Sequence, residues 1–546
     1  DQSGISVSLS GSGAFVAIGA SEHAAARGHV RVFQFVTDAW VQVGGDIEGE
    51  AEGAKSGLFV SISDDGSRVA MSSHLSDSNA LDDSGLVRVF DFDSTSSSWV
   101  QAGPSIFGEG AGDFSGWSLE LSGNGERVVV GAKLNDGNGD AAGHVRTFEF
   151  VPGENVWEQI GEDIEGRSAG DNAGSSVSTC ANGQRVAVGA PLNDNTNGAD
   201  AGSVRVFQVP FYPTSVPTSE PSSPSHVPTG VPSIVPSSLP SGFPSAFPTS
   251  PSSEPSLKPT PLPTGLTPRP TSEPTNQPSS PTSEPTSSPS SMPTAEPSSS
   301  PSSLPSGEPS SVPSPSPSAV PSGLPTAIPT GVPSALPSTS PSMSPTMFQS
   351  WFQLGSDLTG ENEGDYFGSS VSMSNDCGYL AVGSKLSDVP GEKAGHVSVY
   401  EYDSGTDTWN QKGSDIVGEA AQDQSGGAVS LSADGSRVAI SGDRNDGFDV
   451  NAGHVRIFEF SSDISDWSQL GSDIDGEGRV DLSGRSVSLS NDGSRVAIGA
   501  NLNDGAGGSN ANAGHVRVFD YSTAVSDWVQ VGSDIDGAEA GDQSGI

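Results

Sequence analysis

The feature that most constrains this chain is an internal repeat of about 58 residues. Successive copies begin at Asp1, Ala54, Asp113, Asp171, Asp365, Asp423 and Asp481. One late copy, residues 481–541, reads DLSGRSVSLSNDGSRVAIGANLNDGAGGSNANAGHVRVFDYSTAVSDWVQVGSDIDGAEAG. Self-similarity at a fixed period of this length indicates an array of equal units, each of which buries its apolar residues against its neighbours.

Each copy carries four short runs of β-branched residues separated by Gly, Asp and Asn. In the copy above these runs are SVSLS, RVAIG, HVRVFDY and WVQVG. In five of the seven copies the first two runs are joined by an Asp-Gly or Asn-Gly pair, such as Asp434-Gly435 and Asp492-Gly493, which favours tight type I′ hairpins. Each copy is therefore predicted to be a four-stranded antiparallel sheet.

A proline-rich insertion interrupts the fourth copy. Residues 210–346 hold 38 of the 42 prolines of the chain, in variations of PSSxP and PTSEP. With few aromatic residues and no polar–apolar alternation, such a segment cannot bury enough surface to offset its ordering entropy, so we expect it to be disordered and partly polyproline II. The many Ser and Thr residues of the insertion are typical of O-glycosylated segments. The alternative interpretation is a plain spacer.

Strand-like sequence on both sides of the insertion belongs to one repeat. Residues 203–209 (SVRVFQV) are a third strand, and residues 351–364 (WFQLGSDLTGENEG) supply the missing fourth strand and exit loop. We therefore predict repeats one to three and the first part of repeat four in residues 1–209, the insertion in 210–346, and the rest of the same domain in 347–546. The predicted fold is all-β, a seven-bladed β-propeller of four-stranded blades.

The net charge of −44, from 67 acidic and 23 basic residues, argues against binding to nucleic acid or to an anionic membrane surface. The sequence contains no apolar run of 18 residues, so we expect no insertion into a membrane. It also lacks the H-E-x-x-H and phosphate-loop patterns, so we expect no enzymatic activity.

Acidic residues concentrate in loops that a propeller places on one face, namely the loops after the second strands and the loops between blades. The candidate ligand residues of this acidic face are Asp77, Asp194, Asp388, Asp446 and Asp504. A negative face favours Ca²⁺, Mg²⁺ or a cationic partner. The alternative is a solvated face that keeps the protein soluble.

One of these loops resembles the beginning of a calcium-binding loop. The sequence DGNGD places Asp136, Asn138 and Asp140 at alternate positions, which is the start of the EF-hand pattern without its distal acid. We predict these three residues as a candidate metal site, with Ca²⁺ as the cofactor.

Other recurring residues favour structural roles. The Gly-His-Val histidines (His29, His144, His396, His454 and His515), the nearby third-strand arginines and the seven fourth-strand tryptophans recur at fixed repeat positions, so we expect structural roles. The arginines, such as Arg31, Arg146, Arg456 and Arg517, are expected to pair with acidic residues of the next strand or blade. Trp117 replaces a small residue at a strand start and is predicted to line the central channel. Cys180 and Cys377 lie in adjacent predicted blades but at different repeat positions, so their pairing stays open.

The repeats resemble the FG-GAP repeat of integrin α-subunit propellers and their bacterial and algal relatives. The resemblance is carried by Phe367-Gly368, Val382-Gly383 and the GHVSVY segment of repeat five, and by VGAP at residues 188–191. It covers all seven repeats, and the Pro-Ser tract is similar to low-complexity segments of algal surface proteins. The calcium loop of integrin hairpins is not carried over, because hairpins such as residues 432–437 (SADGSR) hold too few carboxylates.

The resemblance implies an extracellular or cell-surface module for adhesion or ligand binding. We therefore expect a non-enzymatic, monomeric propeller that binds a glycan or an extracellular protein through its acidic face. The alternatives are a structural cell-wall or matrix protein without a discrete ligand and, less favoured, a carbohydrate-active enzyme.

Overall fold

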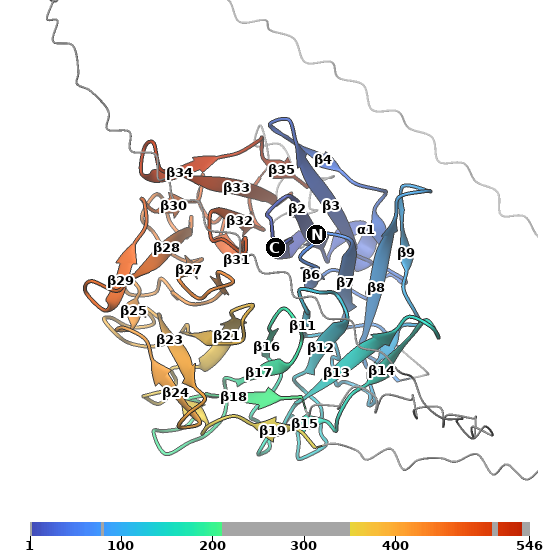
Figure 1. Ribbon diagram of the computed structural model, residues 1–546, viewed down its shortest axis with the longest axis horizontal. Helices are drawn as coiled ribbons and strands as arrows, with labels where there is room; N and C mark the ends of the chain where they lie inside the picture. The colour runs from blue at the N-terminus through green and yellow to red at the C-terminus, as the bar shows by residue number, and fades with distance from the viewer. Residues whose placement is uncertain (1–2, 78–80, 210–349, 505–511, 538–546) are drawn as a thin grey trace, which may run out of the picture. The chain divides into compact units, whose positions relative to one another are not determined.

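The computed structural model describes residues 3–77, 81–209, 350–504 and 512–537. Within them the strands form seven antiparallel sheets arranged in a ring, one for each sequence repeat (Figure 1). The predicted seven-bladed β-propeller is therefore confirmed. The predicted disorder of residues 210–346 concerns residues outside the described part of the chain.

The first strand of each blade lines the axis, and the second strand pairs with it through a tight hairpin. The predicted type I′ turn is wrong, because only the glycine of each Asp-Gly or Asn-Gly pair has a positive φ, such as Gly435 at 63°. The first strands are β1 (Ser3–Leu9), β6 (Val60–Ile62), β11 (Ser118–Leu121), β16 (Ser176–Thr179), β21 (Phe367–Met373), β26 (Val429–Leu431) and β31 (Ser483–Leu489). The second strands are β2 (Phe15–Ala20), β7 (Arg68–Ser73), β12 (Arg127–Ala132), β17 (Arg185–Ala190), β22 (Tyr379–Ser384), β27 (Arg437–Gly442) and β32 (Arg495–Ala500). Their burial explains the near-continuous apolar sequence of the second strands, which lie between neighbouring blades.

The third strand is the longest, and the fourth is broken into two short pieces that both pair with it. The third strands are β3 (His29–Val36), β8 (Leu86–Asp93), β13 (His144–Val151), β18 (Ser203–Gln208), β23 (His396–Asp403), β28 (His454–Ser461) and β33 (His515–Ser522). The first pieces of the fourth strands are β4 (Ala39–Gln42), β9 (Ser98–Gln101), β14 (Val156–Gln159), β19 (Phe352–Gln353), β24 (Thr408–Gln411), β29 (Asp466–Gln469) and β34 (Asp527–Gln530). The second pieces are β5 (Ile47–Glu48), β10 (Ile106–Phe107), β15 (Ile164–Glu165), β20 (Leu358–Thr359), β25 (Ile416–Val417), β30 (Ile474–Asp475) and β35 (Ile535–Asp536).

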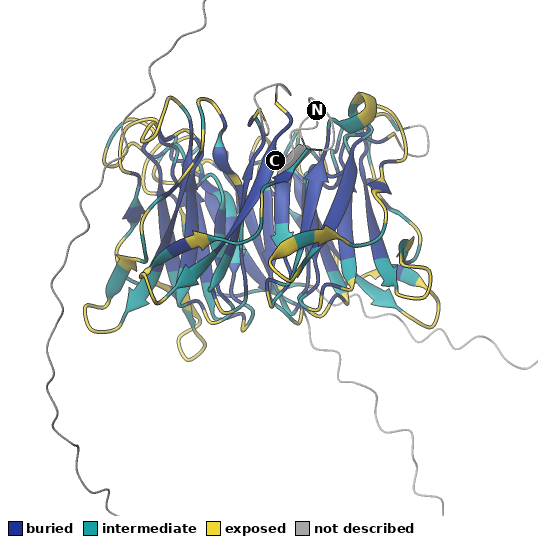
Figure 2. Cartoon of the chain, turned by 90° about the horizontal axis from the view of Figure 1, so that it is seen from above, coloured by how far each residue is buried: buried dark blue, intermediate teal, exposed yellow. Residues whose placement is uncertain are grey.

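Blade four draws its strands from both sides of the insertion. The third strand β18 pairs with β19 and β20, so that Phe207 lies opposite Gln353 and Val204 lies opposite Leu358. The short helix α1 (His23–Ala26) lies in the loop after β2, on the upper face in Figure 2. That face carries the loops after the second strands and the loops between blades.

Apolar packing occurs between blades rather than within them. Seven buried clusters each join two adjacent blades, and the cluster between blades seven and one, with Val516 and Val518 against Val7 and Leu9, closes the ring. Buried strand centres and exposed loops follow from this stacking (Figure 2), because each sheet has both faces covered by its neighbours.

Side chains at repeated positions form hydrogen bonds between each blade and the preceding blade. The indole N–H of each fourth-strand tryptophan donates to a carbonyl of the preceding blade, as Trp157 does to Ala102 at 2.8 Å and Trp467 to Lys412 at 2.7 Å. The third-strand arginines donate to a carbonyl of the preceding blade's last strand: Arg31 to Asp536, Arg88 to Glu48, Arg146 to Phe107, Arg205 to Glu165, Arg456 to Val417 and Arg517 to Asp475. The predicted structural roles of both sets are confirmed. The predicted partner of the arginines is wrong, because they bind the preceding blade and not acidic residues of the next strand or blade.

Candidate functional site

The predicted aspartates of the acidic face all serve the same local purpose. Each side chain accepts a hydrogen bond from a backbone N–H later in its own loop, as Asp446 does from Asn451 at 2.7 Å. The other pairs are Asp77 with Asp83, Asp136 with Ala141, Asp194 with Asp200, Asp388 with Lys393 and Asp504 with Asn512. All six donors have a positive φ of 50–54°, so each carboxylate stabilises a left-handed turn that ordinary residues rarely adopt.

The predicted metal residues of the DGNGD loop are exposed and engaged in hydrogen bonds. The Asn138 amide donates to the carbonyl oxygens of Gly166 (2.7 Å) and Arg167 (3.1 Å). Asp136 holds the Ala141 N–H at 2.8 Å. Among the described residues, the clusters of potential metal ligands lie elsewhere, so binding of Ca²⁺ by Asp136, Asn138 and Asp140 stays a prediction.

A cavity on the axis is the strongest candidate site. Its volume is about 380 Å³, and it is lined by the first strands of all seven blades, which is within the usual range for a small-molecule site. Its wall is rich in hydroxyl groups, including those of Ser176, Ser370 and Ser486. Since the blades are repeats, the positions where the wall departs from the repeat are the ones not required by the fold.

One departure occurs where each first strand begins. The residue after the recurring glycine is Leu58, Trp117, Ser175, Ser369, Gly427 or Arg485 in the blades that contribute it to the cavity wall. The prediction that Trp117 lines the central channel is confirmed. Arg485 on the opposite part of the ring is exposed and pairs with Asp443, with 3.3 Å between Nη1 and Oδ2.

A second departure occurs directly after the second strands, where the chain carries Ser21, His74, Lys133, Pro191, Lys385, Asp443 and Asn501. Lys385 lines the axial cavity. The Lys133 ammonium lies over the Trp117 ring, 2.9 Å from its centroid. The buried His74 ring packs edge-on against Trp117, with 5.5 Å between the two ring centroids. The aromatic Trp117 and the cationic Lys133 and Lys385 therefore converge at the mouth of the cavity.

Burial and repulsion between like charges lower the pKa of the lysine side chains at the mouth of the cavity. Desolvation, together with the charge of Lys385, lowers the pKa of Lys133 to about 8. Desolvation and the charges of Arg485 and Arg444 also lower the pKa of Lys385, although Asp443 opposes this shift. A cluster of cations that repel one another is stabilised by an anion bound among them.

Deeper in the cavity, Glu120 replaces the serine that six other blades place at the same position. Each of these residues accepts a backbone N–H from the next blade, as Ser61 does from Leu121 (3.0 Å) and Glu120 does from Thr179 (2.7 Å). Desolvation raises the pKa of Glu120 to about 7, and its hydrogen bonds to Ser178 and Thr179 oppose the shift.

The axis narrows at the other face. Hairpin backbones bond from blade to blade around it, for example Asp64 N–H to Gly123 O at 2.8 Å and Asn491 N–H to Gly11 O at 2.8 Å. Asn375 donates to Asp64 across the ring at 3.4 Å. The cavity is therefore approached from the face that carries the acidic loops.

Sequence reasoning identified Trp117 and missed the cations beside it. Lys133 and Lys385 follow second strands, where each reads as an ordinary loop residue. The available signal was the comparison of repeats with one another, because lysine at this position occurs in blades three and five alone.

Comparison with known families identifies one part of the chain. Residues 359–400, which include β21, β22 and most of β23, match the family described as FG-GAP repeat. No curated protein matches the chain in sequence.

Solved structures share the fold at low identity. A crystal structure of a putative 6-phosphogluconolactonase from Bacteroides uniformis superposes with a TM-score of 0.50 at 10% identity, covering 97% of this chain and 98% of that one. The periplasmic gluconolactonase PpgL of Pseudomonas aeruginosa gives 0.47 at 11% identity, covering 95% and 93%. At 10% identity the likeness to the first of these structures shows the propeller fold alone.

Proposed function

We propose that this FG-GAP β-propeller, built from repeats typical of extracellular proteins, is a non-enzymatic binding module that holds an anionic saccharide in its axial cavity. The observation that carries the proposal is the meeting of Trp117, Lys133, Lys385 and Arg485 at the mouth of a hydroxyl-lined cavity, in a chain whose net charge is −44.

The chemistry of the mouth suits an acidic sugar. The half-buried Trp117 ring offers a flat apolar surface for the face of a pyranose ring. The ammonium of Lys385 and the guanidinium of Arg485 offer charge-assisted hydrogen bonds to a carboxylate or sulfate. Serine hydroxyls on the wall can accept hydrogen bonds from sugar hydroxyls, because those of Ser176 and Ser370 donate their own hydrogen to Gly368 O and Gly426 O.

The surrounding acidic loops limit the position at which an anion can bind to the axis. Their aspartates place negative charge around the mouth, so an anion is repelled from the rim and attracted at the axis. The competing proposal is that the acidic face binds Ca²⁺, Mg²⁺ or a cationic partner through the carboxylate oxygens that the loop bonds leave unused.

One structural fact supports an extracellular or cell-surface location. Cys180 and Cys377 form a disulfide, a bond that persists in oxidising compartments. Within the described residues there is no helix with the length and apolar character needed to cross a membrane.

The test is binding to an array of neutral, uronic and sulfated glycans by the full chain. The matched variants replace each mouth residue with one found at the same position of another blade: Trp117→Ser, Lys385→Ser and Arg485→Ser. We expect acidic glycans to bind and each variant to weaken binding at least tenfold, and Asp77→Asn to leave it unchanged. Equal binding by all three variants, turnover of the glycan, or binding abolished by a calcium chelator would overturn the proposal.

A further inference from the structure

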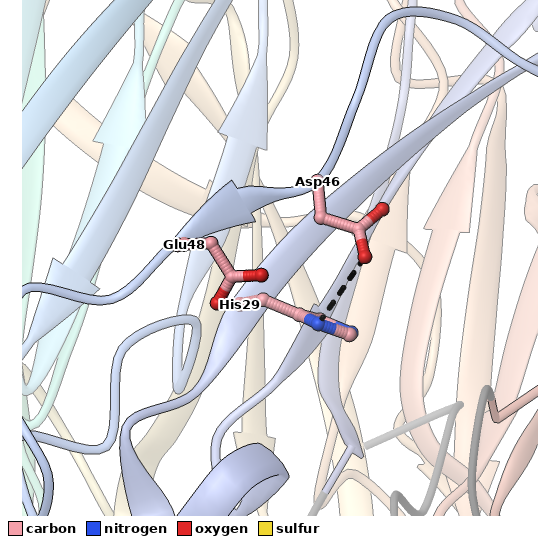
Figure 3. A group of neighbouring side chains, drawn as sticks. All are labelled: His29, Asp46 and Glu48. Atoms are coloured by element: carbon pink, nitrogen blue, oxygen red, sulfur yellow. Dashed lines mark ion pairs between the residues drawn. The ribbon is translucent and has the colours of Figure 1, made fainter.

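A recurring group of three side chains lies where the third strands begin, away from the axial cavity. The His that begins the third strand meets an Asp from the turn within its own fourth strand and a Glu from the exit loop of the preceding blade. The groups are Glu109, His144 and Asp163; Glu419, His454 and Asp473; and Glu477, His515 and Asp534. A variant in blade one uses His29, Asp46 and Glu48 (Figure 3).

The group in blade six has the best-defined geometry. His454 Nδ1 lies 3.7 Å from Asp473 Oδ2 and 3.9 Å from Glu419 Oε2. The side chain of His454 is 1% exposed, and its Nδ1 has no hydrogen-bond partner. A buried nitrogen directed at two carboxylates without bonding to either is a costly arrangement unless a further group completes it.

The blade-three group repeats this feature independently. His144 Nδ1 is buried and lacks a hydrogen-bond partner, and it lies 3.7 Å from Asp163 Oδ2. These separations exceed a hydrogen bond. They are close to the ~3.4 Å between two ligand atoms of a tetrahedral ion whose bonds are about 2.1 Å long.

We propose that Glu419, His454 and Asp473, and likewise Glu109, His144 and Asp163, each bind a divalent transition-metal ion such as Zn²⁺. One imidazole nitrogen and two carboxylate oxygens form a ligand set that suits Zn²⁺, Co²⁺ or Mn²⁺ better than the all-oxygen preference of Ca²⁺. Three protein ligands leave a position open to solvent for water or for a ligand atom.

The neighbouring arginine orients the glutamate of each group. Arg456 Nη1 lies 3.7 Å from Glu419 Oε1, while its Nη2 donates to Val417 O at 2.8 Å. The other oxygen of Glu419 faces His454. The equivalent Arg146 lies 3.2 Å from Glu109, so in both groups a fixed guanidinium positions the carboxylate that comes from the preceding blade.

Binding would join two blades through a metal. Glu419 belongs to the loop that leaves blade five, whereas His454 and Asp473 belong to blade six. The ion therefore bridges the interface next to the arginine bond, and we expect it to raise the thermal stability of the ring by favouring the folded state that holds it.

Two blades provide natural controls. In blade five, the Asp415 carboxylate accepts a 2.6 Å hydrogen bond from Ser398, and this aspartate does not join a metal-ligand group among the described residues. In blade two, Leu86 stands where the histidine would be. Blade five tests whether an aspartate already bonded to a serine binds metal although His396 is present and buried. Blade two tests whether acidic residues bind metal without the histidine.

The experiment titrates the purified full chain, stripped with a chelator, with Co²⁺, and follows visible d–d absorption and calorimetric stoichiometry. We expect Glu419→Gln and Asp473→Asn each to remove one equivalent of bound Co²⁺, and Asp415→Asn to remove none. Zn²⁺ should displace Co²⁺ and raise the melting temperature. No Co²⁺ absorption, or the same stoichiometry in Glu419→Gln, Asp473→Asn and wild type, would overturn the proposal. The exposed Glu419 and the half-buried Asp473 are each replaced by an amide of the same shape, and an unchanged melting temperature of the metal-free variants verifies that the fold tolerates both changes.

Discussion

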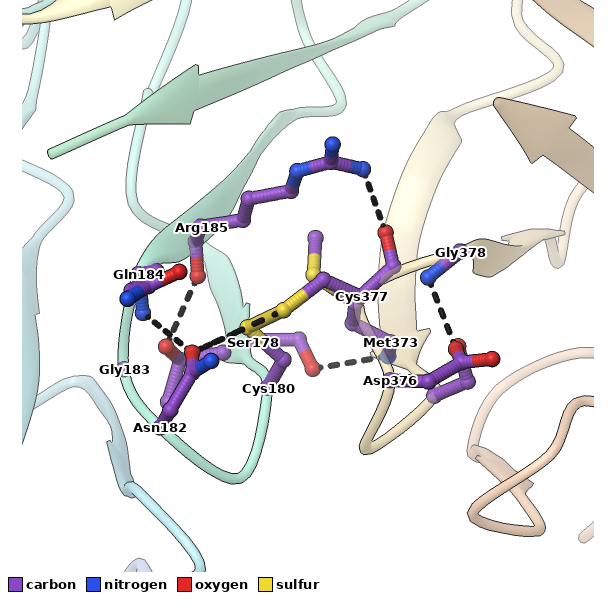
Figure 4. Close-up of a disulfide and its surroundings, with 12 residues drawn as sticks. Ser178, Cys180, Asn182, Gly183, Gln184, Arg185, Met373, Asp376, Cys377 and Gly378 are labelled. Carbon is purple, nitrogen blue, oxygen red and sulfur yellow. Dashed lines mark hydrogen bonds between the residues drawn. A yellow bond between two sulfur atoms is a disulfide. The ribbon is translucent and has the colours of Figure 1, made fainter. Parts of the chain in front are cut away.

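Cys180 of blade four and Cys377 of blade five are joined by a disulfide, with Cα atoms 5.1 Å apart, although 197 residues separate them in sequence (Figure 4). The bond spans the interface at which the third-strand arginine of the other blades is replaced by Ser398. Blade four also takes its last strand from beyond the insertion. The disulfide therefore stabilises the interface that lacks the arginine bond.

Removing this disulfide should destabilise the whole ring. Because the bond closes a loop of 197 residues, loop-closure entropy predicts a loss of about 5 kcal/mol in the free energy of unfolding. Cys180→Ser with Cys377→Ser, measured by urea unfolding, should show this loss. A reducing agent should lower the melting temperature of the wild type and leave that of the double variant unchanged; an equal response of both would contradict the assignment.

An arginine introduced at position 398 should partly compensate for the loss of the disulfide. Ser398→Arg places a guanidinium where Arg456 and five others bond to the preceding blade, here within reach of Thr359 O. In the double cysteine variant we expect it to regain about 1 kcal/mol, measured by the same unfolding curves. Ser398→Lys is the control, since an ammonium lacks the planar fork of the guanidinium. A gain equal to that of arginine would show that charge alone is responsible.

Glu120 should make stability depend on pH. Its pKa in the folded protein is raised to about 7 by desolvation, so the folded state disfavours its ionised form. The stability of the wild type is then fully present below the pKa of the unfolded chain and is lost as pH rises through 7. Glu120→Gln retains an acceptor for the Thr179 N–H and removes the charge.

We therefore expect Glu120→Gln to unfold like wild type near pH 4 and to be more stable by about 1–3 kcal/mol at pH 8. Thermal unfolding across this range measures the difference. Ser61→Ala, which alters the equivalent bond without a titrating group, should show a constant difference. A stabilisation of Glu120→Gln that is equally large at pH 4 would refute the account.

The aspartates of the acidic face should act through hydrogen bonding. Asp446→Ala removes the acceptor for the Asn451 N–H, whose residue has a φ of 50°, and should cost about 1 kcal/mol and speed hydrogen exchange at Asn451. Asp446→Asn keeps an oxygen there and should preserve both properties. If instead Asp446→Asn is as damaging as Asp446→Ala, the charge of the residue matters more than its bond.

Much of the architecture could be predicted from the sequence, because the repeat carries it. The β-branched runs, the Asp-Gly turns and the regular tryptophans determine four strands per unit, and seven units are enough to close a ring. Comparison of the repeats with one another also assigned residues 203–209 and 351–364 to one sheet. The first segment is a third strand without a fourth, and the second segment supplies that fourth strand.

The contacts that distinguish one blade from another required the tertiary structure. The two cysteines occupy different repeat positions, the start of one hairpin and the turn of the next. These positions meet because hairpins of neighbouring blades stack around the axis. Gly13 of blade one and Ser490 of blade seven occupy the positions that Cys377 and Cys180 have in their blades. A Cβ atom on Gly13 would lie 3.3 Å from the Cβ atom of Ser490.

The axial site has the same origin. Lys133, Lys385 and Arg485 come from blades three, five and seven, and no local pattern relates them. The sequence by itself determined the unit, through its period and strand propensities. Only closure of the ring decided which unrepeated side chains share a cavity, because distance across the axis depends on how seven sheets pack and not on separation along the chain.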